Sequence, residues 1–153
     1  AVGGPSLALG YWKDPEQTRA RFVAGWWRSG DMGFVDAEGD LFITGRTDNL
    51  INSGGIKVHA EEIERVLLAH PEVVQAAVVG QPDERWGQRI EAYVVLRAAD
   101  LATDALEAHC RAAGLAGFKL PKLFRRVASL PTGPTGKLYR RALRTSGADR
   151  QES

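Results

Sequence analysis

The sequence is poor in the residues that carry redox, metal and membrane chemistry. Cys110 is its only cysteine, so no disulfide can form within the chain and we expect a reducing, cytoplasmic compartment. His59, His70 and His109 lack the close spacing of metal ligands, so no metal site is expected. No apolar run approaches the ~20 residues that span a bilayer, and no basic flank precedes an apolar stretch at the N-terminus. We therefore expect no membrane span.

Acidic residues are absent from a long segment near the C-terminus. No Asp or Glu occurs between Ala108 and Ala148, although the formal net charge of the whole chain is only +1. The basic residues of this segment are Arg111, Lys119, Lys122, Arg125, Arg126, Lys137, Arg140, Arg141 and Arg144. This asymmetry predicts that the segment faces an anion, with a solvated basic face as the alternative. The small net charge gives no whole-molecule reason to expect nucleic acid.

The familiar phosphate-binding and catalytic motifs are also missing. The stretch LPTGPTGKLYRRAL (130–143) looks like half of a phosphate loop, but a Walker A loop needs G-x-x-x-x-G-K-[ST]. Pro131 stands where its first glycine belongs, and Leu138 replaces the hydroxyl that binds Mg²⁺. No G-x-G-x-x-G, H-E-x-x-H, C-x-x-C or G-x-S-x-G occurs either. The anion that this loop serves must therefore be inferred from the rest of the chain.

Hydrophobic periodicity outlines the secondary structure of an ordinary globular chain, 44% hydrophobic and 25% charged. A short helix is expected near 15–22, and an Asp-Ala-Glu-Gly turn within 33–45 predicts a hairpin. A second strand pair turns at 53–55, and a helix follows in which Ile63, Val66 and Leu67 share one face. Pro71 ends this helix.

The second half of the chain continues this alternation. The apolar run 73–80 predicts a strand covered on both faces, whereas the alternation in 89–96 predicts a half-buried strand. The remaining expected elements are an amphipathic helix over 103–113 through Leu106, Cys110 and Ala113, a strand over 123–130, a short helix over 138–144 and a disordered tail over 145–153. The order β-β-α-β-β-α-β-α predicts a small α+β fold, a sheet carrying helices.

Five stretches in register give the chain a family resemblance. They are GYWKDPEQT…GWWRSGDMG, GRTDNLINSGGIKVHAEEIERVL, DERWGQ, GFKLPK and LPTGPTGK. Together they resemble the C-terminal part of the adenylate-forming (AMP-binding) enzymes, which include acyl- and aryl-CoA ligases, luciferases and peptide-synthetase adenylation domains. DERWGQ and GFKLPK are similar to the branch of aryl- and fatty-acid-CoA ligases.

The resemblance implies a piece of a larger ligase. Residues 1–47 would end the large N-terminal domain, a hairpin-rich remnant, and 48–144 would form the mobile C-terminal domain. The partners would be the missing N-terminal domain and a small carboxylic acid. The ATP triphosphate loop and the acid pocket would lie upstream, so Mg²⁺ is expected with ATP but outside this segment. The piece alone is expected to be inactive, and short-chain, fatty and aromatic acids stay open as substrates.

The resemblance assigns three residues to the nucleotide and the hinge. Asp31 would accept both ribose hydroxyls of ATP or AMP, because a carboxylate offers two acceptor oxygens. Arg46 would support the ribose or phosphate side with its planar guanidinium. Asp48 would be the hinge, where a short polar side chain tolerates two backbone states. A turn aspartate and a surface arginine remain the structural alternatives for Asp31 and Arg46.

Lys137 would be the catalytic residue. Adenylation brings a carboxylate to the α-phosphate of ATP, so negative charge accumulates on both partners. A lysine carried by a glycine-flanked loop would supply a compact, mobile cation to that transition state. The alternative is an exposed lysine after a Pro-Gly turn.

The resemblance assigns four residues to coenzyme A. Gly54 and Gly55 would let their loop approach the pantetheine arm, where a Cβ would intrude. Trp86 and Phe118 would form a shelf for the adenine, since bases stack readily on aromatic rings. An ordinary β-turn and core packing are the respective alternatives.

Two lysines would contact the CoA phosphates. Lys119 and Lys122 carry this role, although some aryl-CoA ligases have an arginine where this sequence has Leu120. Arg125 and Arg126 are the candidates to take the place of that arginine. A peptide-synthetase adenylation domain, which loads a carrier protein, and a small basic nucleic-acid-binding domain remain as rival interpretations.

Overall fold

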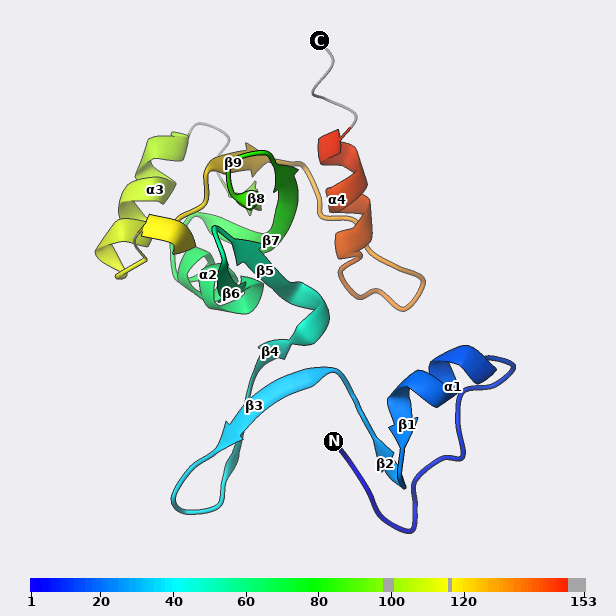
Figure 1. Cartoon of the computed structure of the whole chain (residues 1–153). Coiled ribbons are helices and arrows are strands. Elements are labelled where there is room, and N and C mark those ends of the chain that lie inside the picture. Colours follow the sequence, from blue (N-terminus) through cyan, green and yellow to red (C-terminus); the bar gives the residue numbers. More distant parts are fainter. Residues whose placement is uncertain (98–100, 116, 149–153) are drawn as a thin grey trace. The chain divides into compact units, whose positions relative to one another are not determined.

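The computed structural model describes residues 1–97, 101–115 and 117–148. The chain divides into two compact units, here called the N-terminal unit (Ala1–Asp48) and the C-terminal unit (Asn49–Ser153). Figure 1 labels the helices and strands of both units.

The N-terminal unit consists of a short helix and two small antiparallel strand pairs. Asp14 caps the N-terminus of helix α1 (Pro15–Arg21), because its Oδ1 accepts the Gln17 N–H at 2.9 Å. Proline occupies the first turn of this helix, a position that it favours. Strand β1 (Phe22–Val23) pairs with β2 (Trp26–Trp27), and β3 (Asp31–Val35) pairs with β4 (Leu41–Arg46). The predicted helix near 15–22 and the predicted hairpin are thereby confirmed.

An aspartate builds the turn of the β3–β4 hairpin. Asp36 Oδ1 accepts the backbone N–H groups of Glu38 at 3.1 Å and Asp40 at 2.8 Å. Such side-chain bonds to the local backbone explain why Asp is common in turns. The hairpin ends at Arg46, from which a 3₁₀ turn (Thr47–Asn49) leads into the next strand.

The C-terminal unit has the predicted order β-β-α-β-β-α-β-α. Its elements are β5 (Leu50–Ser53), β6 (Ile56–His59), α2 (Ala60–Leu68), β7 (Val73–Asp83), β8 (Gly87–Leu96), α3 (Thr103–Ala112), β9 (Leu123–Arg126) and α4 (Arg140–Ala148). The strands form one sheet in the order β6-β5-β8-β7, and β9 pairs with β8 in parallel. This mixed arrangement confirms the α+β class (Figure 1).

Helices cover both faces of this sheet. On one face, Ile63 and Leu67 of α2 and Leu106 and Cys110 of α3 pack with the main hydrophobic core. On the other face, Leu143 of α4 packs on residues of β7 and β8 in a second cluster of Ala77, Val79 and Tyr93. The apolar run in β7 therefore faces helices on both sides, as predicted.

The expectation of a half-buried strand over 89–96 was wrong. Glu91 and Tyr93, which alternate with the apolar residues of β8, are also buried, with 0% and 4% of their surfaces exposed. Helix α4 covers the face that the alternation assigned to solvent. The two carboxylate oxygens of Glu91 contact Arg89 Nε and Arg125 Nε at 2.8 and 2.9 Å, so the buried acid has two basic partners.

Two further expectations differ from the structure. Helix α3 buries Leu106 and Cys110, but Ala113 follows the helix and is exposed. The predicted disordered tail began at residue 145, whereas α4 continues to Ala148. The rest of that tail, 149–153, lies outside the described residues.

Candidate functional site

The N-terminal unit brings Asp31, Arg46 and Asp48 together. Asp31 and Arg46 face each other across the hairpin, and Arg46 Nε lies 3.8 Å from Asp31 Oδ1. Arg46 Nη2 lies 3.9 Å from Asp48 Oδ2, and Arg21 Nη2 lies 3.7 Å from the same oxygen. The Asp31 side chain is 39% exposed. Its carboxylate is therefore accessible to a ligand with two hydroxyl donors.

The Ser-Gly-Asp turn has a physical requirement for its glycine. Gly30 has a φ of +83°, and a Cβ there would approach Arg21 Nη1 to 2.8 Å. The Gly30 carbonyl accepts from Thr47 Oγ1 at 2.6 Å, and the Ser29 carbonyl accepts from Arg46 Nη2 at 3.2 Å. The two ends of the hairpin are thus joined around Asp31.

Asp48 lies at the boundary between the two units. It is the middle residue of the 3₁₀ turn between β4 and β5, and its side chain is 61% exposed. The next residue, Asn49, is mostly buried and donates from Nδ2 to Glu61 Oε1 of α2 at 2.5 Å. A single peptide bond therefore separates the exposed Asp48 from Asn49, which is anchored to α2.

In the C-terminal unit, Gly54 lies against the side chain and the backbone carbonyl of Trp86. Gly54 and Gly55 have φ values of +61° and +82° in the turn between β5 and β6, which favours glycine at both positions. The Gly54 N–H donates to the Trp86 carbonyl at 2.8 Å. A Cβ on Gly54 would lie 3.0 Å from Trp86 Cε3, whereas one on Gly55 would meet nothing within 4 Å. The sequence indicated the turn but not this contact.

Two basic side chains lie near the aromatic ring of Trp86. Arg85 Cζ lies 4.9 Å and Lys122 Nζ 5.6 Å from the ring centroid. The backbone N–H of Trp86 donates to Asp83 Oδ1 at 2.9 Å, and this bond orients the turn between β7 and β8. Phe118 is 38% exposed in the 3₁₀ turn Gly117–Lys119, and its ring does not stack on Trp86. The structure thus places Lys122 beside the Trp86 ring, whereas Phe118 is a separate exposed ring.

The basic residues expected to contact phosphates differ in their surroundings. Lys119 Nζ lies 2.6 Å from Glu62 Oε1 of α2, whereas Lys122 Nζ contacts the Gly117 carbonyl at 3.4 Å. Leu120 packs in the main core with 5% of its surface exposed. Arg125 is bound to Glu91, and this hydrogen bond raises the pKa of Arg125. Arg125 is therefore already engaged with the buried acid in this structure.

Lys137 lies at the end of a small hairpin-like loop. Thr132 and Leu138 form a bridge, the Gly133 N–H donates to the Lys137 carbonyl at 2.8 Å, and the Tyr139 N–H donates to the Pro131 carbonyl at 2.8 Å. The side chain of Lys137 is exposed, and among residues 1–97, 101–115 and 117–148 no acid forms an ion pair with it. The loop therefore presents an ammonium group that a ligand can use.

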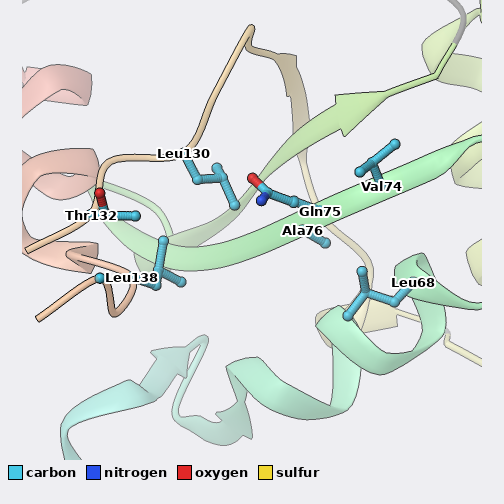
Figure 2. Close-up of a pocket in the computed structure, with 8 residues that line it drawn as sticks. Leu68, Val74, Gln75, Ala76, Leu130, Thr132 and Leu138 are labelled. Atoms are coloured by element: carbon cyan, nitrogen blue, oxygen red, sulfur yellow. The ribbon is translucent and has the colours of Figure 1, made fainter.

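A cavity of about 290 Å³ opens beside this loop. Figure 2 shows Leu130, Thr132 and Leu138 of the loop across from Leu68 of α2 and from residues 74–76 of β7. The lining is mostly apolar, with Gln75 and Thr132 as its polar side chains. Little side-chain packing thus supports the loop on this side.

A family model for the AMP-binding enzyme C-terminal domain matches residues 62–137. This segment belongs to that family. The curated relatives include the 4-chlorobenzoate–CoA ligase of Arthrobacter sp., 46% identical over 88% of this chain and 26% of the relative. Another is the sulfoacetate–CoA ligase of Cupriavidus necator, 48% identical over 90% of this chain and 27% of the relative. The chain thus spans about a quarter of the curated relatives that it matches.

A solved structure extends the likeness of the AMP-binding C-terminal domain to three dimensions. The o-succinylbenzoate CoA synthetase of Bacillus subtilis, in complex with its acyl-adenylate intermediate, matches with a TM-score of 0.85 and 36% identity. The match covers 92% of this chain and 29% of that chain. The predicted resemblance to the adenylate-forming CoA ligases is confirmed. No helix in the described part of the chain is long and apolar enough to cross a bilayer.

Sequence reasoning missed the buried polar residues of this AMP-binding C-terminal domain. Glu64 is 8% and Gln81 1% exposed, and each contacts a residue of α4. Glu64 accepts from Arg140, and Gln81 donates to the Leu143 carbonyl. The spacing of Glu64 gave a usable signal, because it falls between Ile63 and Leu67 on the buried side of α2. Its partner Arg140, 76 residues later, had no such signal.

Proposed function

We propose that this chain is the C-terminal part of an ATP-dependent carboxylic acid:CoA ligase. Residues 1–47 would complete a larger N-terminal domain, and the segment from Asp48 through α4 would be the mobile domain. The carrying observation is the exposed amine of Lys137, on a loop stabilised by its own hydrogen bonds, within a segment of the AMP-binding C-terminal family. ATP and a carboxylic acid would be the first substrates, with Mg²⁺ bound by the part of the enzyme outside this chain.

The first half-reaction forms an acyl-adenylate. A carboxylate oxygen attacks the α-phosphorus of ATP, an O–P bond forms, and pyrophosphate leaves with the electron pair of the broken bond. Lys137 would lie beside the reacting oxygens and stabilise the charge that accumulates there. Asp31 would accept the ribose hydroxyls, and Arg46, within 3.8 Å of Asp31, would orient that carboxylate.

The second half-reaction forms the thioester. Rotation at Asp48 would withdraw Lys137 and present Gly54, Gly55 and the Trp86 ring to coenzyme A, whose thiol then displaces AMP. Trp86 supports this role because its aromatic face lies beside Lys122 and Arg85, which suits an adenine ring next to phosphates. Gly54 and Gly55 would line the path of the pantetheine arm, and Phe118 would offer a second aromatic surface. Lys119 would contact phosphate only by leaving Glu62.

Lys137→Ala in the full-length enzyme tests the proposal. Adenylation, followed as pyrophosphate release, should fall by at least about 100-fold, the scale of losing one electrostatic contact to a transition state. Thioester formation from supplied acyl-adenylate should stay within about threefold of the unmodified enzyme, since Lys137 is withdrawn in that step. Lys57→Ala is the matched control, because Lys57 of β6 is an exposed lysine of the same unit with no role in the proposed mechanism. Equal loss in both half-reactions, or none in adenylation, contradicts the proposal.

A further inference from the structure

We propose that Glu64 and Arg140 are positioning residues that fix the orientation of the Lys137 loop for adenylation. This inference rests on the proposed role of Lys137. It arises from a buried ion pair that neither half-reaction uses directly and that joins the base of the loop to the rest of its unit.

The loop is internally ordered but has limited support from the sheet. Its backbone bonds, from Pro131–Tyr139 at the base to Gly133–Lys137 near the tip, hold the loop in one internal conformation. The cavity of about 290 Å³ separates part of the loop from α2 and β7 (Figure 2). The orientation of Lys137 therefore depends on how the base of the loop is attached.

Apolar contacts attach the base without specifying its angle. Leu130 and Leu138 pack against the second cluster, together with Val127. Apolar contact is non-directional, so it holds the loop near the sheet but resists rotation weakly. A directional contact is required to select one orientation.

The Glu64–Arg140 pair is such a contact. Arg140 Nη2 donates to Glu64 Oε1 and Oε2 at 2.8 and 2.7 Å, and Glu64 Oε1 also accepts the Val78 N–H at 2.8 Å. The side chains of Glu64 and Arg140 are 10% and 21% exposed, so water and salt screen this pair less than they screen a surface pair. One carboxylate thus links α2, β7 and the first residue of α4, three residues after Lys137.

The test measures both half-reactions in the full-length enzyme. Arg140→Ala should lower kcat for pyrophosphate release by about 100-fold, because a shift of about 1 Å in a catalytic group has an effect of that size. Glu64→Gln keeps the shape and the acceptor for Val78 but removes the charge, and should lower the same kcat by about 10-fold. For both variants, KM for ATP and thioester formation from supplied acyl-adenylate should stay within about threefold.

Glu91→Gln is the matched control. Glu91 of β8 is a second buried carboxylate, and it accepts from Arg89, Arg125 and the Tyr93 hydroxyl, none of which belongs to the Lys137 loop. Its pyrophosphate release should stay within about threefold even where its melting temperature falls as far as that of Glu64→Gln. Arg140→Lys, which keeps the charge, should recover at least tenfold of the rate lost in Arg140→Ala.

A double variant separates this inference from the proposed function. If Arg140 acts only by placing Lys137, adding Arg140→Ala to Lys137→Ala should cause no further loss in adenylation. A further loss, an equal fall in the thioester step, or a Glu91→Gln variant as slow as Glu64→Gln would overturn the positioning role. If Lys137→Ala itself leaves adenylation intact, the proposed function fails; if only Lys137→Ala is slow, the positioning role alone fails.

Discussion

The two units differ most in what they do with their apolar side chains. Every hydrophobic side chain that is buried in the described residues belongs to the C-terminal unit, where helices cover both faces of the sheet. The β3–β4 hairpin of the N-terminal unit leaves Phe34, Leu41 and Ile43 exposed at 55%, 66% and 60%. Both units contain regular antiparallel pairs, so strand pairing alone does not make a core. A second layer does.

The same contrast applies to charge. The carboxylate of Glu91 is buried and paired with arginines at 2.8 and 2.9 Å, whereas the Asp31–Arg46 and Asp48–Arg46 pairs are exposed and lie at 3.8 and 3.9 Å. Exposed pairs contribute about 0–1 kcal/mol and exchange partners easily. The N-terminal unit thus keeps these charges at its surface, and the C-terminal unit uses several of its own for structure.

The largest difference should follow from truncating one apolar residue in each unit. Leu67→Ala should lower the free energy of unfolding by about 2–5 kcal/mol, because Leu67 is fully buried in the main core. Ile43→Ala should change it by less than about 0.5 kcal/mol, because Ile43 is already exposed. Urea denaturation of this chain followed by circular dichroism measures both. Comparable losses would show that the N-terminal unit has a core that its exposure does not reveal.

A smaller difference should appear within the Gly-Gly turn. Gly55→Ala should cost about 1–2 kcal/mol, because an alanine is strained at a φ of +82°. Gly54→Ala should cost about 1 kcal/mol more, because its Cβ would also press on Trp86 at 3.0 Å. Denaturation gives the energies, and a shift in tryptophan emission for Gly54→Ala but not Gly55→Ala would identify the contact. Identical emission spectra would argue against it.

The smallest effect should come from the charge cluster of the N-terminal unit. Arg46→Ala should raise amide hydrogen exchange at Thr47, whose N–H donates to the Gly30 carbonyl at 2.8 Å, by no more than about fivefold, equivalent to about 1 kcal/mol. The Arg46 side chain is 51% exposed, so added salt should reduce the difference between variant and parent. An effect of tenfold or more that persists in salt would mean that the cluster is structural.

Much of the fold could be predicted from local pattern. The helical period placed Ile63 and Leu67 on one face, and the turn residues marked both hairpins, because these signals arise within a few residues of the chain. The burial of Glu91 and Tyr93 could not be predicted in this way. It depends on α4, which begins about 50 residues later. In the sequence alone, a polar side chain that such a distant element covers has the same pattern as one that faces solvent.

The candidate site shows the same limit. Gly54, Trp86 and Lys137 were identifiable by their motifs, and the exposed amine of Lys137 agrees with the structural requirement of its proposed role. Lys119 was treated like Lys122, yet only Lys119 has a carboxylate of α2 within 2.6 Å. Sequence distance hides such pairs, because Glu62 and Lys119 meet only after the sheet and α2 have assembled.

The link between the units is short. Strand β4 ends at Arg46 and β5 begins at Leu50, so only the turn Thr47–Asn49 intervenes. Each residue of this turn contributes two soft backbone torsions, φ and ψ, so the link has few rotatable bonds. Asp48→Pro would fix one of these torsions without changing the length of the link.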